Sequence, residues 1–329
     1  MEQALIYLRI YFSGSASVVI YNFGSSVLRA LGDSRRPTIV LIFCSLLNVA
    51  LDYLLVVVLK MDVAGAAIAT VAAQAFSSVY IIVCLMRAKG VARLHPSRIR
   101  IEKTCLRQMI RIGIPAGLQV IAYSVSNLLI QRYINSFSTD MVAAYSAYEK
   151  VEALYLMMVE AFGTAVTIYA GQNFGCGRYD RMKKSVTVCT VMCFGFTAVI
   201  SVVLLLLQRS ILGLFTSEES VITLGCRVMQ CIAPYYFTCV LISILPGALR
   251  SAGDALGPIL ITAAGVCVFR VVFIAVGLHF WHDIQVICYS YPASWGLTSL
   301  VFWWYYRKTK WLERCIRRTP PAENASAPA

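Results

Sequence analysis

The sequence predicts an all-α integral membrane protein with about nine transmembrane helices. Hydrophobic residues make up 59% of the 329 residues and charged residues only 14%. The mean hydropathy is +0.72, which excludes an ordinary soluble domain. The apolar residues also gather in runs that reach the roughly 20 residues a helix needs to cross a bilayer. The loops between these runs leave no room for a soluble domain.

Each run is long enough to cross the membrane. They lie at about 5–28, 38–59, 63–86, 108–131, 141–170, 185–207, 228–249, 258–278 and 284–306. The second run contains Asp52 as its only ionisable side chain, and an ionised carboxylate at lipid depth costs about 2.5 to 3.5 kcal/mol. Asn48 lies one helical turn before Asp52 on the same face. This pair is therefore a candidate functional site.

Basic residues concentrate in alternate loops, which predicts the orientation of the chain. The loops at 29–36, 87–111, 171–184 and 250–257 and the tail from Arg307 carry most of the Lys and Arg, whereas the intervening loops carry few. By the positive-inside rule, the first set and the C-terminus are cytoplasmic. The loops also account for the net charge of +13, so no nucleic-acid partner is expected.

Signals for an enzyme or a bound cofactor are poor. The twelve cysteines show no CxxC spacing and most fall in apolar runs, so we interpret them as small buried hydrophobes. The sequence shows no phosphate-binding glycine loop, metal-ligand cluster or Ser/His/Asp arrangement. An intramembrane aspartyl protease would need two facing aspartates, and Asp52 is the only one within a run. We expect neither catalysis nor a cofactor.

An internal repeat predicts the organisation of the helices. The segment 28–37 shares leucine, arginine, glycine, aspartate and proline with the segment 249–258 at equivalent positions. The first three runs then correspond to the last three in the same orientation, as a parallel repeat requires. In both copies Gly-Asp ends one helix and a proline opens the next. The alternative interpretation is that these residues only mark the end of one helix and the start of the next.

The repeat divides the chain into four parts. Residues 108–312 form a complete six-helix lobe, and residues 1–90 are the last three helices of another lobe, so we expect three N-terminal helices to be missing. Residues 91–107 form a basic linker, which we expect to lie on the anionic cytoplasmic leaflet. Residues 313–329 are expected to be a disordered cytoplasmic tail by their composition.

Polar side chains in the second half form a further candidate site. Glu149, Glu152 and Glu160 share one side of the run 141–170 at 100° per residue. Gln119, Tyr123 and Asn127 follow one another at four-residue intervals on the preceding run and could face them. Arg270 is a candidate counter-charge for one of the carboxylates.

Structural roles compete with these functional interpretations. Asn48 and Asn127 could join helices through hydrogen bonds worth about 0.6 to 2 kcal/mol each. A pair of Arg270 with Glu160 could be purely structural. Glu149 and Lys150 lie nearest the outer end of their run and could simply be solvated.

Five segments of the sequence resemble the multidrug and toxic compound extrusion (MATE) family of secondary antiporters, which belongs to a larger group that includes lipid-linked oligosaccharide flippases. They are LRALGD at 28–33 with Pro37, LNVALD at 47–52, GAAIAT at 65–70, GIPAGLQ at 113–119 and GQNFG at 171–175. The resemblance extends from about Ala4 to Leu312. It implies a twelve-helix fold with two lobes around a central cavity, in which these nine helices are similar to helices 4–12.

The resemblance also implies roles for individual residues. Many MATE proteins form a cation site from side chains on the first, fourth, fifth and sixth helices. The matching positions here are Tyr7, Asn48, Asp52 and Thr70, of which the last three are candidate Na⁺ ligands, while the first-helix aspartate is absent with its helix. The substrate-binding residues are expected to be Gln119, Tyr123, Asn127, Glu152, Glu160 and Arg270.

Together, the residues and the resemblance predict a cation-coupled antiporter. We expect Na⁺ or H⁺ to drive the export of an amphipathic, cationic drug or metabolite by alternating access. The expected location is the cell membrane, a bacterial inner membrane, where the protein contacts lipids as a monomer. One alternative is a lipid-linked oligosaccharide flippase, which predicts a strongly basic cavity. Another is a non-transporting fragment, which the genomic sequence upstream of Met1 would test.

Overall fold

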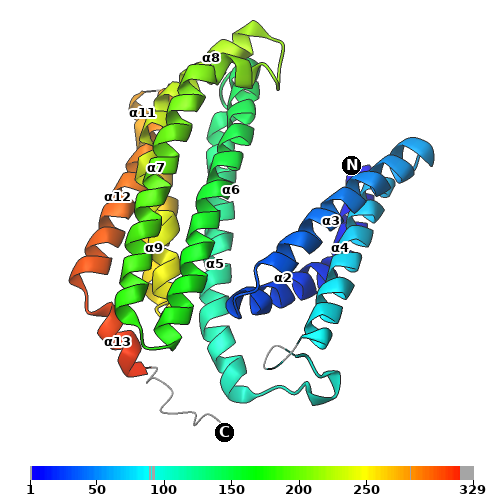
Figure 1. Ribbon diagram of the computed structural model, residues 1–329. Coiled ribbons are helices and arrows are strands. Elements are labelled where there is room, and N and C mark those ends of the chain that lie inside the picture. The colour runs from blue at the N-terminus through cyan, green and yellow to red at the C-terminus, as the bar shows by residue number, and fades with distance from the viewer. Residues whose placement is uncertain (1, 89, 91–92, 282, 319–329) are drawn as a thin grey trace. The chain divides into compact units, whose positions relative to one another are not determined.

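The computed structural model describes residues 2–88, 90, 93–281 and 283–318, which form helices and short connections without a strand (Figure 1). Apolar runs dominate these elements, as predicted. In chain order they are α1 (Glu2–Ser13), α2 (Ser15–Ala30), α3 (Arg35–Asp52), the π-helical η1 (Tyr53–Val58), α4 (Asp62–Arg87), the 3-10 turn η3 (Pro96–Arg98), α5 (Lys103–Ile134), α6 (Thr139–Gly175), α7 (Tyr179–Leu212), α8 (Glu219–Ile232), the 3-10 segment η4 (Ala233–Cys239), α9 (Val240–Ser251), α10 (Leu256–Thr262), the π-helical η5 (Ala263–Phe269), α11 (Arg270–Phe280), α12 (Ile284–Lys308) and α13 (Trp311–Arg318).

The prediction of an all-α, multi-pass membrane protein is confirmed. Seven helical segments of the described chain are long and apolar enough to cross a membrane, and α1 and α2, bent by 44° at their junction, together make an eighth. The ninth predicted span corresponds to α12, a helix of 25 residues. Its middle is less apolar than the others because it is rich in serine, tyrosine and tryptophan.

The chain separates into two compact units, residues 1–101 and 102–329, which we call the N-terminal and C-terminal units. Their boundary falls within the segment 91–107, the predicted linker. In the N-terminal unit, α1, α2 and α3 each pack against α4. Side chains from α2, α3 and α4 form its buried cluster, which comprises Tyr21, Leu28, Val40, Cys44, Ile81 and Leu85.

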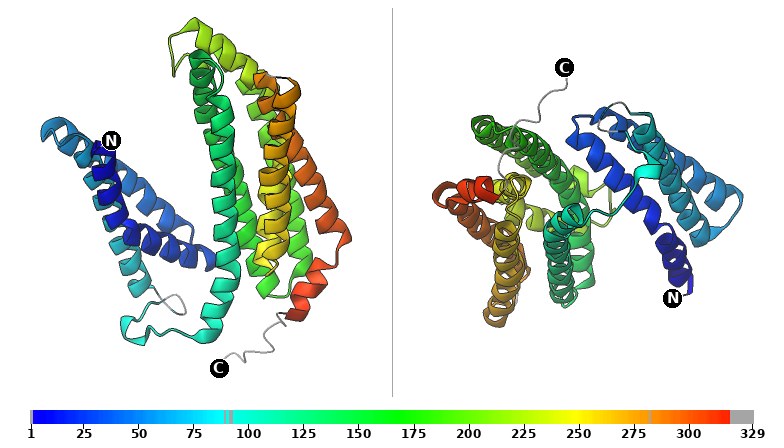
Figure 2. Two further views of the ribbon diagram at one scale, coloured as in Figure 1. Left: turned by 180° about the vertical axis from the view of Figure 1, so that it is seen from behind. Right: turned by 90° about the horizontal axis from the view of Figure 1, so that it is seen from below.

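In the C-terminal unit, α6 packs against α7, α8 and α9 (Figure 1, Figure 2). The backbones of α6 and α9 come very close together. A Cβ atom added to Gly163 would lie 2.5 Å from the carbonyl oxygen of Ser243, and one added to Gly247 would lie 2.8 Å from that of Gly163. Small residues four positions apart on facing helices allow such a crossing in membranes.

The sequence repeat is also a repeat of local structure. Gly32 and Gly253 follow the ends of α2 and α9 with φ of 92° and 94°, a left-handed conformation that glycine adopts without a Cβ clash. In both copies the glycine N–H donates to the arginine carbonyl three residues earlier at 3.0 Å. The next N–H donates to the leucine carbonyl five residues earlier, at 2.9 Å in the first copy and 3.0 Å in the second. These bonds define a Schellman cap.

The predicted disordered tail, 313–329, requires a correction. Residues 313–318 belong to α13, whereas residues 319–329 lie outside the described part of the chain. Trp311 and Cys315, one turn apart, are only 3% and 4% exposed and join the core. Arg314 Nη2 donates to the Tyr305 hydroxyl at 3.2 Å. A short amphipathic helix is therefore held by packing that composition does not reveal.

Candidate functional site

Three helices carry the predicted cation-binding residues of the N-terminal unit. Tyr7 lies on α1, Asn48 and Asp52 lie on α3, and Thr70 lies on α4, and all four side chains are partly buried. Because α1 and α3 both pack against α4, their helices are neighbours. No hydrogen bond joins the four side chains in the described chain.

Asn48 and Asp52 each contain a buried polar atom without a partner. Asn48 Nδ2 and Asp52 Oδ1 are shielded from solvent and form no hydrogen bond in the described chain. Leaving such an atom unpaired costs about 1 to 3 kcal/mol. The Asp52 oxygen is therefore free to accept a proton or a cation, and a bridging water could join it to the Asn48 amide one turn away.

The surroundings of Asp52 also offer oxygen ligands. The Thr70 hydroxyl donates to the carbonyl of Ala66 at 3.0 Å, which leaves its oxygen lone pairs available. A carboxylate and a hydroxyl oxygen suit a hard cation such as Na⁺. The π-helical η1 begins at Tyr53, directly after Asp52, and π segments in α-helices frequently occur at functional sites.

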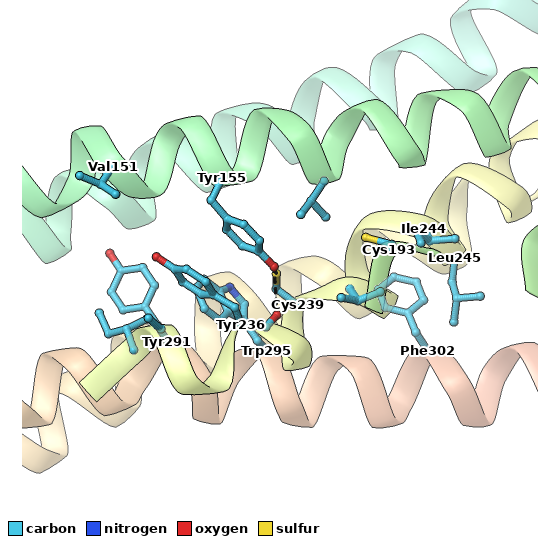
Figure 3. Close-up of a cluster of buried hydrophobic side chains, with 14 of the residues drawn as sticks. Val151, Tyr155, Cys193, Tyr236, Cys239, Ile244, Leu245, Tyr291, Trp295 and Phe302 are labelled. Carbon is cyan, nitrogen blue, oxygen red and sulfur yellow. Dashed lines mark hydrogen bonds between the residues drawn. The ribbon is translucent and has the colours of Figure 1, made fainter. Parts of the chain in front are cut away.

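The C-terminal unit buries one of its predicted carboxylates. Glu152 on α6 is only 6% exposed. The Tyr148 hydroxyl donates to Glu152 Oε1 at 3.1 Å and lies 3.0 Å from the Tyr236 hydroxyl. The ring of Tyr236 stacks on Tyr155 with centroids 4.1 Å apart (Figure 3). Because a buried carboxyl group needs hydrogen-bond donors, this tyrosine cluster is what accommodates Glu152.

Arg270 is buried as well, but aromatic rings hold it. The side chain is 3% exposed, and its guanidinium lies 4.2 Å from the ring centre of Tyr291 and 5.7 Å from that of Trp295. Its Nε donates to the Ser294 hydroxyl at 2.9 Å, and its Nη2 is buried without a partner. No carboxylate of the described residues forms an ion pair with Arg270, including Glu160, so the role of Arg270 as a counter-charge for one of the carboxylates stays a prediction.

The other predicted acids do not join this cluster. Glu149 and Glu160 are exposed while Glu152 is buried, so the three carboxylates do not share one environment. Their helical angles differ by up to 80°, and the packing of α7, α8 and α9 around α6 separates them. The sequence alone does not place those neighbours.

The predicted polar stripe of α5 also lies differently from expectation. Helix α5 packs mainly against α10, η5 and α11, and only weakly against α6. Gln119 Oε1 accepts a long hydrogen bond of 3.5 Å from Arg250 Nη1. Tyr123 is partly buried and Asn127 is exposed.

Sequence reasoning missed the tyrosines around Glu152. Tyr145 donates to Tyr291 at 2.7 Å, and Tyr145, Tyr148 and Tyr155 are all at most 2% exposed. A signal was present, because positions 145, 148, 152 and 155 follow the spacing of a single helix face. The sequence therefore predicts that these side chains share a face of α6. It does not predict that Tyr236 on η4 and Tyr291 on α12 pack against them.

Comparisons with known proteins agree with this architecture. The family model described as MatE matches residues 1–54 and 115–276. A Bacillus subtilis protein named "Probable multidrug resistance protein YpnP" is 30% identical over 305 residues, which cover 93% of this chain and 68% of that protein. A Thermotoga maritima protein named "Probable multidrug resistance protein NorM" is 24% identical, covering 80% of this chain and 58% of that protein.

Solved structures share the fold. A crystal structure of MATE in the straight conformation superimposes with a TM-score of 0.88 at 18% identity, covering 94% of this chain and 71% of that one. A transporter of the MOP superfamily from Pyrococcus furiosus Vc1 gives a TM-score of 0.87 at 18% identity, covering 92% of this chain and 69% of that one. With the family model matching more than half of its length, the chain belongs to the MATE family of membrane transporters.

Proposed function

We propose that this protein exports amphipathic, cationic small molecules in exchange for Na⁺ or H⁺ by alternating access. The named relatives from Bacillus subtilis and Thermotoga maritima, both described as multidrug resistance proteins, support the class of cargo. The coupling ion binds at Asp52, with Asn48, Thr70 and Tyr7 as neighbouring polar groups. Cell-membrane localisation with a cytoplasmic C-terminus follows from the basic loops.

One observation carries the proposal. Asp52 Oδ1 and Asn48 Nδ2 are buried within a span and lack hydrogen-bond partners in the described chain. A proton or a cation at Asp52 neutralises a charge that is expensive at this depth. Because neutralisation changes which arrangement of the helices is lower in free energy, ion binding can be linked to the movement of cargo.

In the C-terminal unit, Glu152 is the carboxyl group that meets the cargo or a second proton. Its burial among tyrosines gives an aromatic environment with one acid, which suits an organic cation. Among the described residues of this unit, the buried charged side chains are Glu152 and Arg270, which have opposite signs. They do not form the strongly basic cavity that a lipid-linked oligosaccharide flippase would need.

The test is transport by the Asp52→Asn variant. Wild-type protein in proteoliposomes should move ethidium, a lipophilic cation, when a Na⁺ or H⁺ gradient is imposed. The variant should lose gradient-driven transport by about tenfold or more, since even 1.4 kcal/mol of lost coupling is a factor of ten. Dye fluorescence in the lumen measures the rate.

Asp62→Asn is the matched control, because Asp62 is an exposed acid at the start of α4. It should transport like the wild type. Undiminished gradient-driven exchange by Asp52→Asn would refute the coupling role of Asp52. A wild-type protein that moves a lipid-linked sugar instead of ethidium would refute the cargo class.

A further inference from the structure

Two cysteines of the C-terminal unit are direct neighbours. Cys231 lies near the end of α8, and Cys288 lies in the second turn of α12. The two helices pack together, Cys288 belongs to the buried core, and Cys231 packs against that core. Their side chains lie next to each other. Both are reduced in the structure.

Cys231 is the more accessible of the two thiols. It is partly exposed, whereas Cys288 is only 1% exposed. The Tyr289 side chain also lies beside the Cys231 side chain. Tyr289 also lines a cavity of about 600 Å³ between α11 and α12, whose walls include Phe273 and Val286. A small reagent in this cavity therefore lies one side chain away from the Cys231 thiol.

The predicted orientation places the pair toward the oxidising side of the membrane. Helix α8 follows the connection 213–218 and α12 follows the connection 281–283, which lie within the predicted loops 208–227 and 279–283. Both loops are poor in Lys and Arg, so the positive-inside rule assigns them to the non-cytoplasmic side. Disulfides form and persist on that side, whereas cytosolic thiols are kept reduced.

We propose that Cys231 and Cys288 are a redox-active dithiol that forms an intramolecular disulfide by exchange with a low-molecular-weight disulfide. The Cys231 thiolate attacks one sulfur of the donor, RSSR, and displaces one RS⁻ to give a mixed disulfide. The Cys288 sulfur then attacks Cys231 and displaces the second RS⁻. The two cysteine protons end on the two released RSH molecules, so one donor disulfide is reduced as one protein disulfide is formed.

The link would join two elements at a break in a span. Cys231 lies two residues before η4, the 3-10 segment that separates α8 from α9. Helix α12 packs against both α8 and η4. A disulfide between α8 and α12 therefore fixes the start of the break and raises the temperature at which the unit unfolds, because it restricts the unfolded chain.

The experiment maps the thiols of the purified full chain in detergent. After incubation with 2-hydroxyethyl disulfide, a small neutral donor, the remaining thiols are alkylated under denaturing conditions and the peptides are identified by mass spectrometry. We expect the peptides with Cys231 and Cys288 to appear linked, with a mass two hydrogen atoms below their sum. Dithiothreitol should restore alkylation at both positions.

Cys193 and Cys239 provide the internal control. Both side chains belong to the buried cluster drawn in Figure 3. Both are at most 1% exposed, and the Cys239 sulfur lies 3.3 Å from the Tyr155 hydroxyl. They should remain alkylated throughout. In the Cys231→Ser variant Cys288 should stay alkylated, whereas Cys189→Ser should leave the linked peptides unchanged.

Two outcomes would overturn the proposal. One is full alkylation of both positions in the wild type after treatment that converts a free thiol such as Cys105, which is exposed, into its mixed disulfide. The other is linkage of Cys231 or Cys288 to a different cysteine in preference to each other.

Discussion

Arg270 and Glu152 have opposite charges in one unit, yet each is accommodated by aromatic side chains. Arg270 lies against Tyr291 and Trp295, while Glu152 accepts a hydrogen bond from Tyr148. Stacking on a ring face needs a planar guanidinium, which lysine lacks. The aromatic surroundings therefore select each side chain by its shape as well as by its charge.

We predict that Arg270→Lys destabilises the protein by about 2 kcal/mol, because the ammonium loses the stacked contact and the Nε hydrogen bond in a desolvated site. The measurement is thermal unfolding in detergent, followed by tryptophan fluorescence. Arg227→Lys is the control, since Arg227 is exposed on α8. An unchanged unfolding temperature for Arg270→Lys would show that the stacked contact contributes nothing to stability.

The sequence predicted which residue types matter better than it predicted their surroundings. Asp52 is unusual in any interpretation, because it is an acid inside an apolar run, and the structure gives it a buried unpaired oxygen. For Glu149, Glu152 and Glu160, the helical period restricts the face only to a broad arc. Whether a carboxylate is buried depends on which helix covers that arc, and this is long-range information.

At the scale of elements, the close crossing of α6 and α9 depends on glycines, which have no side chain to keep the two backbones apart. Gly163 and Thr167 on α6 face Ser243 and Gly247 on α9, and a Cβ added to Gly247 would collide with Thr167 Oγ1. Without a hydrophobic driving force between helices in lipid, such close packing holds the pair together. The crossing also positions Glu152, which lies three turns before Gly163 on α6.

We predict that Gly247→Ala lowers stability by about 1 to 3 kcal/mol, because the added methyl group overpacks the crossing against the α6 backbone. Gly195→Ala is the matched control, since no atom beyond its own helix lies within 4 Å of an added Cβ there. The unfolding temperatures of both variants in the same detergent make the comparison. Equal unfolding temperatures would contradict the close crossing.

The elements themselves were largely predictable, but their interruptions were not. Nine apolar runs correspond to eight span-forming segments and α12. The breaks η1, η4 and η5 escaped the sequence analysis because apolar residues continue through them. Proline does not reliably predict where a helix is interrupted, since Pro115, Pro246 and Pro292 lie inside continuous helices. Tertiary packing decides whether a helix accommodates a proline or breaks.

At the scale of the whole molecule, the two units contain the same helix-cap motif but different ionisable residues. The Schellman caps at Gly32 and Gly253 coincide in conformation. The positions equivalent to Asn48 and Asp52 in the second copy are Phe269 and Phe273. The repeat therefore conserves how helices end, while the ionisable residues of each unit differ.

We predict that Gly253→Ala destabilises the protein by about 1 to 2 kcal/mol through the backbone alone, because an L residue is strained at this φ and nothing lies within 4 Å of the added Cβ. Gly32→Ala should act in the same direction. Thermal unfolding of both variants provides the test. A stabilising effect of Gly253→Ala would be incompatible with a left-handed cap.

An aspartate follows the cap glycine in both units, and the two aspartates have different side-chain partners. Asp33 Oδ2 pairs with Arg36 three residues away, at 3.3 Å. Asp254 Oδ2 accepts a hydrogen bond of 2.7 Å from Tyr305 at the end of α12, and the same hydroxyl receives Arg314 of α13. Both copies close their own turn, because each aspartate Oδ1 accepts a hydrogen bond from the backbone N–H three residues later, at 3.1 Å from Arg36 and 3.3 Å from Gly257. The second copy is in addition joined to α12 and α13. The repeated Gly-Asp pair therefore closes a turn in both units, and in the C-terminal unit it also connects the helix cap to the C-terminal helices.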